Sequence, residues 1–508
     1  MKAPLKIALL GLVSLLQLTA CQNGKRKVTD KTEVYFLHED INQESFGGLG
    51  VEWGTYEDTD KLIEGGWDLV LRHMDHLGAA RIRLMTNYDW FCQNFDDKGD
   101  KDKTNDTWTY NYTNKYAKNM IDILEYCQTH DIDVAFGAWN VIGNLSGDVW
   151  HMMDEVTSDI RWAKISADTL DFLVNKKGFT CIKWFVNSNE PNWLGSAGSS
   201  KNFNNTYEKW AQGVKNVRAA LDKVGLQKVG IIGGDTTGFA GCEEYLLNIS
   251  KGLKDKVADY GAHLYLSNIT IDRGEMQTAI EDLYKRIKKN DKRLGKTIQA
   301  DIWEAGLIDG KTALDCQTLI RTPNYAIRMT DYTLQSLAAG INGICYWDFD
   351  DGMHFMYSNT ATTPKEWGMF SSLAEASSAK QELRPWYHTT SLLCHLFEKG
   401  NKIYTPVLAN DEENGTFRSI GTISADGTKG GFVAVNSGRT TVSKRFFLAD
   451  EVKGAENKTY VYIFNEDSYR LGDDGYIIPN YVIDKSINSE FKMDIPKSTV
   501  VVFSNERL

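Results

Sequence analysis

The sequence predicts an α/β fold: a (β/α)8 barrel followed by an antiparallel β-sandwich. From about residue 45 to residue 398, short apolar runs alternate with longer segments whose apolar residues recur at helical spacing. Beyond residue 399 the chain changes to short β-rich runs that are divided by polar or glycine-containing turns. At 508 residues the chain exceeds the roughly 250 of a single barrel, so a second domain is expected.

The expected elements alternate in the order that a parallel barrel requires, because parallel strands need crossover connections. The strand-like runs are residues 45–53, 80–84, 133–140, 181–188, 228–235, 260–266, 297–304 and 343–348. Helical spacing is found over residues 67–77, 116–130, 160–176, 207–224, 276–290, 324–339 and 385–397. The carboxyl ends of the strands should meet at one face of the barrel, where active sites form.

Two of these runs end in a glutamate. The fourth closes on Asn189, Glu190 and Pro191, and proline biases the residue before it toward extended geometry. The seventh closes on Glu304. Hydrolysis of a glycoside by two carboxyl groups needs an acid/base and a nucleophile, so the pair points to a glycosidase. The alternatives are a chance turn at Glu190 and a buried, salt-bridged carboxylate at Glu304.

With glutamates on the fourth and seventh strands, the chain resembles clan A of the retaining glycoside hydrolases. The resemblance implies that Glu304 attacks the anomeric carbon and that Glu190 protonates the leaving oxygen, then deprotonates water. Glu190 should therefore be neutral at rest, with the nearby charge of Glu304 raising its pKa.

Four neighbours follow from the same resemblance. Asn189 should contact the sugar 2-hydroxyl, and Tyr265 should hydrogen-bond the nucleophile. Arg83 matches the clan's arginine near the nucleophile, although Arg81 competes because alternate residues of a strand share a face. Trp347 matches the aromatic platform beneath the sugar.

Aromatic residues and one histidine complete the candidate binding residues. His263 is either a site residue or a packed core histidine. Trp139, Asn140 and Trp193 lie at or just after strand ends, and several of the 14 tryptophans share such positions. Sugar rings stack on aromatic faces, so this enrichment favours a carbohydrate cleft.

Charge and cysteine spacing exclude other classes of protein. The net charge of −11, from 57 basic and 68 acidic residues, argues against nucleic-acid binding. No zinc-type cysteine spacing occurs, and the acidic run 96–102 does not match a calcium loop, so no metal and no cofactor are predicted. The cysteines after Cys21 are expected to be buried free thiols, with a disulfide at Cys92 left open.

The first residues resemble a bacterial lipoprotein signal. Lys2 and Lys6 precede an apolar stretch, and residues 18–20 lead directly to Cys21, the expected lipidation site. An ordinary secretory signal with an incidental cysteine is the alternative. We expect a signal segment over residues 1–21, a tether over 22–31, and anchorage in the bacterial cell envelope, at the outer membrane, through the lipid alone.

The expected domains are the barrel over residues 45–398 and the sandwich over residues 399–508. In barrel-plus-sandwich members of the clan, residues before the first strand join the sandwich, so residues 32–44 should belong to it. The sandwich is expected to buttress the barrel, with carbohydrate binding as the alternative.

The predicted function is retaining hydrolysis of a β-linked polysaccharide or oligosaccharide. The layout is similar to β-xylosidases and glucocerebrosidases, but the third strand lacks the proline-rich motif of the latter. Two alternatives remain open: a catalytically inactive surface glycan-binding lipoprotein, and a transglycosylase that uses the same residues. The sequence leaves the oligomeric state undetermined.

Overall fold

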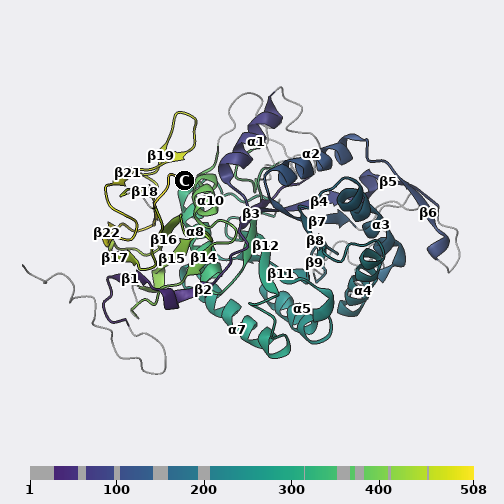
Figure 1. Cartoon of the computed structure of the whole chain (residues 1–508), viewed down its shortest axis with the longest axis horizontal. Helices are drawn as coiled ribbons and strands as arrows, with labels where there is room; N and C mark the ends of the chain where they lie inside the picture. Colours follow the sequence, from purple (N-terminus) through teal and green to yellow (C-terminus); the bar gives the residue numbers. More distant parts are fainter. Residues whose placement is uncertain are drawn as a thin grey trace, which may run out of the picture.

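The structure is a computed structural model with a barrel on one side and a sandwich on the other (Figure 1). It describes residues 28–54, 65–96, 103–140, 158–192, 206–313, 315–351, 366–371, 383–409, 414–454 and 457–508. The expected signal segment with Cys21 lies outside these residues, as do Trp193 and most of the expected tether.

A curled parallel sheet forms the barrel, and its strand order runs β10-β11-β12-β13-β3-β4-β7-β8-β9. Its strands are β3 (Leu49–Glu52), β4 (Arg81–Asn87), β7 (Asp133–Asn140), β8 (Ile182–Val186), β9 (Gly230–Ile231), β10 (Gly234–Thr237), β11 (Asp259–Leu266), β12 (Gln299–Leu307) and β13 (Gly343–Tyr346). The first expected strand pairs with the last through β3 and β13, so the sheet closes on itself.

The fifth expected strand is broken into β9 and β10. The backbone N–H of Ile232 donates to the carbonyl of Phe185 on one side, at 3.0 Å, and the carbonyl of Gly233 accepts from Gly261 on the other, at 2.9 Å. These bonds close the gap between β8 and β11. The two ends of the sheet order are therefore pieces of one strand.

Helices cover the outside of the barrel close to where the sequence placed them. They are α1 (Gly66–Leu77), α2 (Lys115–Thr129), α3 (Ile160–Leu170), α4 (Tyr207–Lys223), α5 (Phe239–Gly252), α6 (Asn268–Asp272), α7 (Glu275–Asn290), α8 (Pro323–Ala338) and α10 (Pro385–Leu396), with a π-helical turn Asp171–Lys176 after α3. Helix α5 was not expected. It starts at Gly238 without a side-chain cap and carries Gly241 in its first turn, so the usual start signals are missing.

The segment between β4 and α2 contains a hairpin that is not among the strand-like runs found in the sequence. Strands β5 (Cys92–Asp96) and β6 (Thr107–Tyr110) pair antiparallel. All seven cysteines of the described residues are free and buried, as expected. Within the same residues, no helix is both long and apolar enough to cross a membrane.

Two sheets form the sandwich, and the chain's first two described strands lie within them (Figure 1). One sheet holds β1 (Glu33–Phe36), β17 (Val442–Leu448) and β22 (Phe491–Ile495); the other holds β2 (Ile41–Gln43), β14 (Lys402–Tyr404), β15 (Phe417–Ile423), β16 (Gly430–Asn436), β23 (Thr499–Ser504), β18 (Thr459–Phe464) and β21 (Tyr481–Ile483). A small hairpin, β19 (Arg470–Leu471) with β20 (Ile477–Ile478), lies beside them. The pair β1–β17 is parallel, and the other pairs of these two sheets are antiparallel.

Both faces of strand β16 are buried. Phe432 packs inside the sandwich, where its ring stacks on Phe36 at 5.3 Å and Phe503 at 4.7 Å between centroids. Val433 and Val435 belong instead to the apolar cluster that includes the barrel helices. Helices α8 and α10 lie between the barrel strands and the sandwich, in contact with β15 and β16 (Figure 1). This continuous packing is what a structural buttress requires.

Below the active-site face, Arg81 fills the barrel interior. Its guanidinium donates to Asp301 at 2.8 Å and lies 5.2 Å from the ring centroids of both Trp184 and Trp303. A Cβ atom added at Gly343 would stand 1.9 Å from Arg81 Nη1. Glycine at that position therefore makes room for the buried cation.

We predict that Gly343→Ala lowers the free energy of unfolding by at least about 1–3 kcal/mol, because the methyl group overpacks the interior. The melting temperature, followed by tryptophan fluorescence, measures the effect. Gly252→Ala is the matched control, since a Cβ atom there meets nothing within 4 Å. Equal melting temperatures for the two variants would contradict the prediction.

Candidate active site

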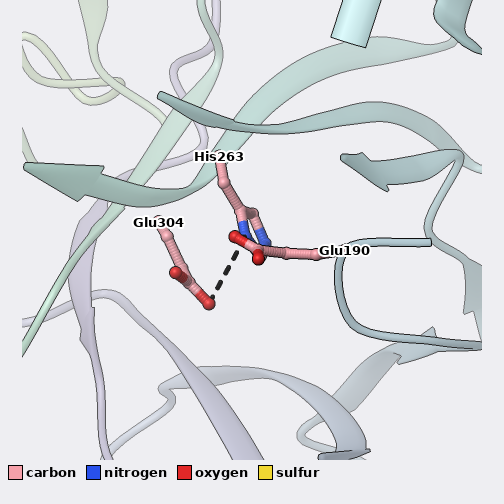
Figure 2. Close-up of side chains that lie close together, drawn as sticks. All are labelled: Glu190, His263 and Glu304. Atoms are coloured by element: carbon pink, nitrogen blue, oxygen red, sulfur yellow. Dashed lines mark hydrogen bonds and ion pairs between the residues drawn. The ribbon is translucent and has the colours of Figure 1, made fainter. Parts of the chain in front are cut away.

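Charged side chains from five strands converge at the carboxyl end of the barrel. Arg83 lies on β4, Glu190 follows β8, and Asp235, His263 and Glu304 lie on β10, β11 and β12. Figure 2 shows the carboxylates of Glu190 and Glu304 and the imidazole of His263 pointing into one space. One ligand atom from each of these three residues lies within 4.8 Å of the other two.

Glu190 adopts a left-handed backbone rather than the extended one that Pro191 favours, with φ of 42°. Two contacts to β10 hold it there. The N–H of Glu190 donates to the carbonyl of Asp235 at 3.0 Å. Asn192 donates to the carbonyl of Thr237 at 2.6 Å and accepts from its N–H at 2.9 Å. The side chain of Glu190 stays 19% exposed, enough to meet a ligand.

Both carboxylate oxygens of Glu304 are held. Arg83 Nη1 donates to Oε1 at 2.8 Å, and the hydroxyl of Tyr265 donates to Oε2 at 2.7 Å. His263 Nδ1 lies 3.4 Å from Oε1. The residue is 5% exposed, so its position is fixed by protein rather than by solvent.

Arg83, and not Arg81, contacts the candidate nucleophile Glu304. Its two terminal nitrogens reach acceptors on four segments: Nη1 donates to Glu52 at 3.0 Å as well as to Glu304, and Nη2 donates to Asn189 at 2.7 Å and to Asp235 at 2.9 Å. The two arginines share a face of β4, but Arg81 points to the deeper layer around Asp301.

His263 contacts two carboxylates of the charged cluster, in addition to being buried. Its Nδ1 lies 3.0 Å from Glu190 Oε1, and its Nε2 lies 2.9 Å from Asp235 Oδ1. The ring is fully buried. The histidine therefore links the candidate acid/base to a second carboxylate.

The aromatic candidates divide into described and undescribed residues. Trp139 lies with its ring 5.2 Å from the guanidinium carbon of Arg83 and meets Trp347 edge to face, with 5.7 Å between centroids. Trp139 therefore borders the charged cluster, and Trp347 lies next to Trp139. Asn140 ends β7, but its side chain lies outside the described part, as does the whole of Trp193. Trp303, which also ends a strand-like run, is buried in the layer of Arg81 and donates to Asp259 at 2.7 Å.

The pKa of Glu190 in the ligand-free site is shifted opposite to the expected direction. Burial raises the pKa of Glu190, but the hydrogen bond and charge of His263 outweigh it, and the net shift is downward. Burial raises the pKa of Glu304 more than the charges of His263 and Arg83 lower it. Burial alone would lower the pKa of His263, yet Asp235 and Glu304 raise it to about 10. Of the two hydrogen-bonded groups, His263 therefore carries the proton and Glu190 is the carboxylate.

Two further residues of the charged cluster, Asp235 and Glu52, were not selected from the sequence. Both are carboxylates at the carboxyl end of an expected strand, which is the criterion that found Glu190 and Glu304. Applying it to every strand would have selected them. Glu52 is 1% exposed, and burial raises its pKa to about 8 although the charge of Arg83 opposes the shift.

Glu190, His263 and Glu304 are residue types that can hold a metal ion. Arg83 Nη1, however, donates to Glu304 at 2.8 Å and already places a positive charge at that carboxylate. The donor set therefore suits proton transfer better than metal binding.

Comparison with known proteins identifies the fold. No protein-family profile matches the sequence, and neither does any curated protein. The structure is similar to a GH30 endoxylanase from Clostridium papyrosolvens C71, with 12% identity, 93% of this chain and 98% of that chain covered, and a TM-score of 0.55. It is also similar to the endo-β1,6-glucanase BT3312, with 12% identity, 95% of this chain and 96% of that chain covered, and a TM-score of 0.60. A third similar structure is AbfB, a family 51 α-L-arabinofuranosidase from Bifidobacterium longum, with 12% identity, 93% of this chain and 99% of that chain covered, and a TM-score of 0.59.

The predicted fold is confirmed. The endoxylanase and AbfB belong to families 30 and 51 of clan A, the clan that the sequence resembles, and no single family is selected. At such low identity, the likeness concerns the barrel and sandwich and not the chemistry.

Glu52 predicts a pH dependence of stability. Its folded pKa of about 8 lies above the ordinary 4.5, so its contribution is fully present below about pH 4.5 and is lost as the pH rises to about 8. Glu52→Gln keeps an acceptor for Arg83 and cannot ionise. We expect the variant to gain stability relative to wild type as the pH rises, by up to about 1.4 kcal/mol per pH unit. Melting temperatures between pH 5 and 9 measure this; a constant difference at every pH would contradict it.

Proposed function

We propose that this protein is a retaining glycoside hydrolase that cleaves a β-linked polysaccharide or oligosaccharide by double displacement. The supporting observation is the separation of the two candidate carboxylates. The oxygens of Glu190 and Glu304 that face each other lie within 4.8 Å. Retaining enzymes have carboxyl groups about 5–5.5 Å apart, whereas inverting enzymes need roughly 6.5–9.5 Å to admit a water molecule.

Glu304 is the nucleophile in this proposal. Its carboxylate attacks the anomeric carbon while the bond to the leaving oxygen breaks, and a glycosyl-enzyme ester forms. Arg83 and Tyr265 hold the two oxygens of Glu304, so little reorganisation is needed as the charge moves to the sugar. The amide oxygen of Asn189 accepts a hydrogen bond from Arg83, so in this proposal the amide NH₂ group donates to a sugar hydroxyl.

Glu190 is the acid/base, and His263 stores its proton. A bound sugar covers the exposed part of Glu190 and removes water, and burial favours the neutral acid and the neutral imidazole over the ion pair. The Nδ1 proton of His263 then passes to Glu190 across the 3.0 Å contact, and Glu190 protonates the leaving oxygen. In the second step Glu190 takes a proton from water, which attacks the ester and frees Glu304.

The location and the sugar are proposed on separate grounds. The signal-like start and Cys21 support a lipid-anchored enzyme of the cell envelope. The similar structures include a xylanase, a β1,6-glucanase and an arabinofuranosidase, which act on different sugars, so they favour a carbohydrate substrate without selecting one.

The proposal predicts that wild type cleaves at least one member of a panel of β-linked polysaccharides and aryl β-glycosides. Glu190→Gln and Glu304→Gln should each lose about 10³-fold or more of that activity on the natural substrate. With an aryl glycoside whose leaving group needs no proton, Glu190→Gln should still release the aryl group in a first turnover, whereas Glu304→Gln should not. Glu243→Gln, on the outer helix α5, is the matched control and should leave activity unchanged.

Proton NMR of the first product identifies the mechanism, because double displacement retains the anomeric configuration. An inverted product would contradict the nucleophilic role of Glu304. Binding of glycans without any cleavage would favour the inactive glycan-binding protein, and transfer to sugar in place of water would favour the transglycosylase.

A further inference from the structure

Asp235 occupies a central position that neither the chain's resemblance nor the two-carboxylate mechanism assigns. It is 2% exposed and lies in β10, the second piece of the broken fifth strand. Its backbone adopts a left-handed conformation, with φ of 53°, which is uncommon outside glycine. Such a backbone in a buried strand persists only where surrounding contacts hold it.

Three contacts join Asp235 to separate parts of the site. Its carbonyl accepts from the N–H of Glu190 at 3.0 Å. Its Oδ1 accepts from His263 Nε2 at 2.9 Å, and its Oδ2 accepts from Arg83 Nη2 at 2.9 Å. One residue thus contacts the acid/base, the histidine that stores its proton, and the arginine that holds the nucleophile.

We propose that Asp235 is the positioning residue of the acid/base: by holding the Nε2–H of His263, it makes Nδ1 the nitrogen that exchanges a proton with Glu190. This inference rests on the proposed function. Asp235 touches no reacting atom, and it acts through His263 and Arg83.

The chemistry of imidazole explains why this contact matters. When His263 gives up a proton, either nitrogen can lose it, and only loss from Nδ1 delivers the proton to Glu190. A carboxylate accepts hydrogen bonds and cannot donate one, so it keeps the proton on Nε2. Burial raises the pKa of Asp235, but the charges of Arg83 and His263 lower it further, so Asp235 stays a carboxylate.

Asp235→Asn tests the inference because it keeps the size of the side chain and removes the charge. The asparagine amide can donate to Nε2 and thereby trap the proton on Nδ1. We expect kcat to fall about 10²-fold or more with KM nearly unchanged, and the alkaline limb of the pH profile to move down by about one unit or more.

Asp301→Asn is the matched control. Asp301 is an equally buried carboxylate, 2% exposed, and it pairs with Arg81 at 2.8 Å in the layer below. Loss of the Asp301 charge should lower the melting temperature without moving the acid or alkaline limb of the pH–activity profile. If Asp235→Asn behaves in the same way, with a lower melting temperature and unmoved limbs, Asp235 serves only the fold and the inference is wrong.

NMR titration of the His263 imidazole gives a readout that needs no substrate. In wild type the ring should stay charged up to about pH 10, and in Asp235→Asn its pKa should fall by more than about one unit. An unchanged titration would overturn the inference. If the titration shifts as expected but wild type cleaves no glycoside in the panel, the proposed function fails while the hold of Asp235 on His263 stands.

Discussion

The site depends on the ion pairs and hydrogen bonds of the buried Arg83 guanidinium. A cation removed from water is costly unless acceptors surround it, and Arg83 is fully buried. Its acceptors come from β3, the segment after β8, β10 and β12, so the neutralisation of one charge fixes the positions of Glu52, Asn189, Asp235 and Glu304 together. The geometry of the candidate chemistry is therefore also a condition for a stable barrel interior.

Two arginines on one strand divide the interior into layers with different tasks. Arg81 is enclosed by Trp184, Trp303 and Asp301. The absence of a side chain at Gly343 leaves room for the guanidinium of Arg81, so this layer is closely packed. The layer of Arg83 retains an opening through the exposed part of Glu190. The closely packed layer of Arg81 lies below the layer of Arg83, and the sandwich packs against helices α8 and α10 from outside. This packing keeps the charged side chains around Arg83 in place although they repel one another.

The sequence predicted the elements that depend on local pattern. Glu190 and Glu304 were found because each ends an apolar run, and Tyr265 and Arg83 followed from the resemblance to the clan; the structure brings all four together. The break in the fifth strand, the left-handed backbone of Glu190 and helix α5 were not predicted, since contacts between strands decide the first two and α5 lacks a start signal. The lowered pKa of Glu190 was not predicted either, because it depends on which charged groups lie close together in the folded protein.

That charge count explains how the site suits its proposed reaction. Glu52 holds a proton near neutral pH, with a pKa of about 8, which leaves the carboxylates of Glu190, Asp235 and Glu304 against the cations Arg83 and His263. The cluster therefore carries an excess of negative charge in a water-poor setting, and burial raises the pKa of Glu304 in the empty site although the charges of His263 and Arg83 oppose the shift. A glycosidic transition state brings positive charge to the sugar ring, so the same excess becomes favourable when the sugar reacts. In the proposed reaction, this negative charge would stabilise the oxocarbenium-like state more than the uncharged substrate, which is the differential stabilisation that catalysis requires.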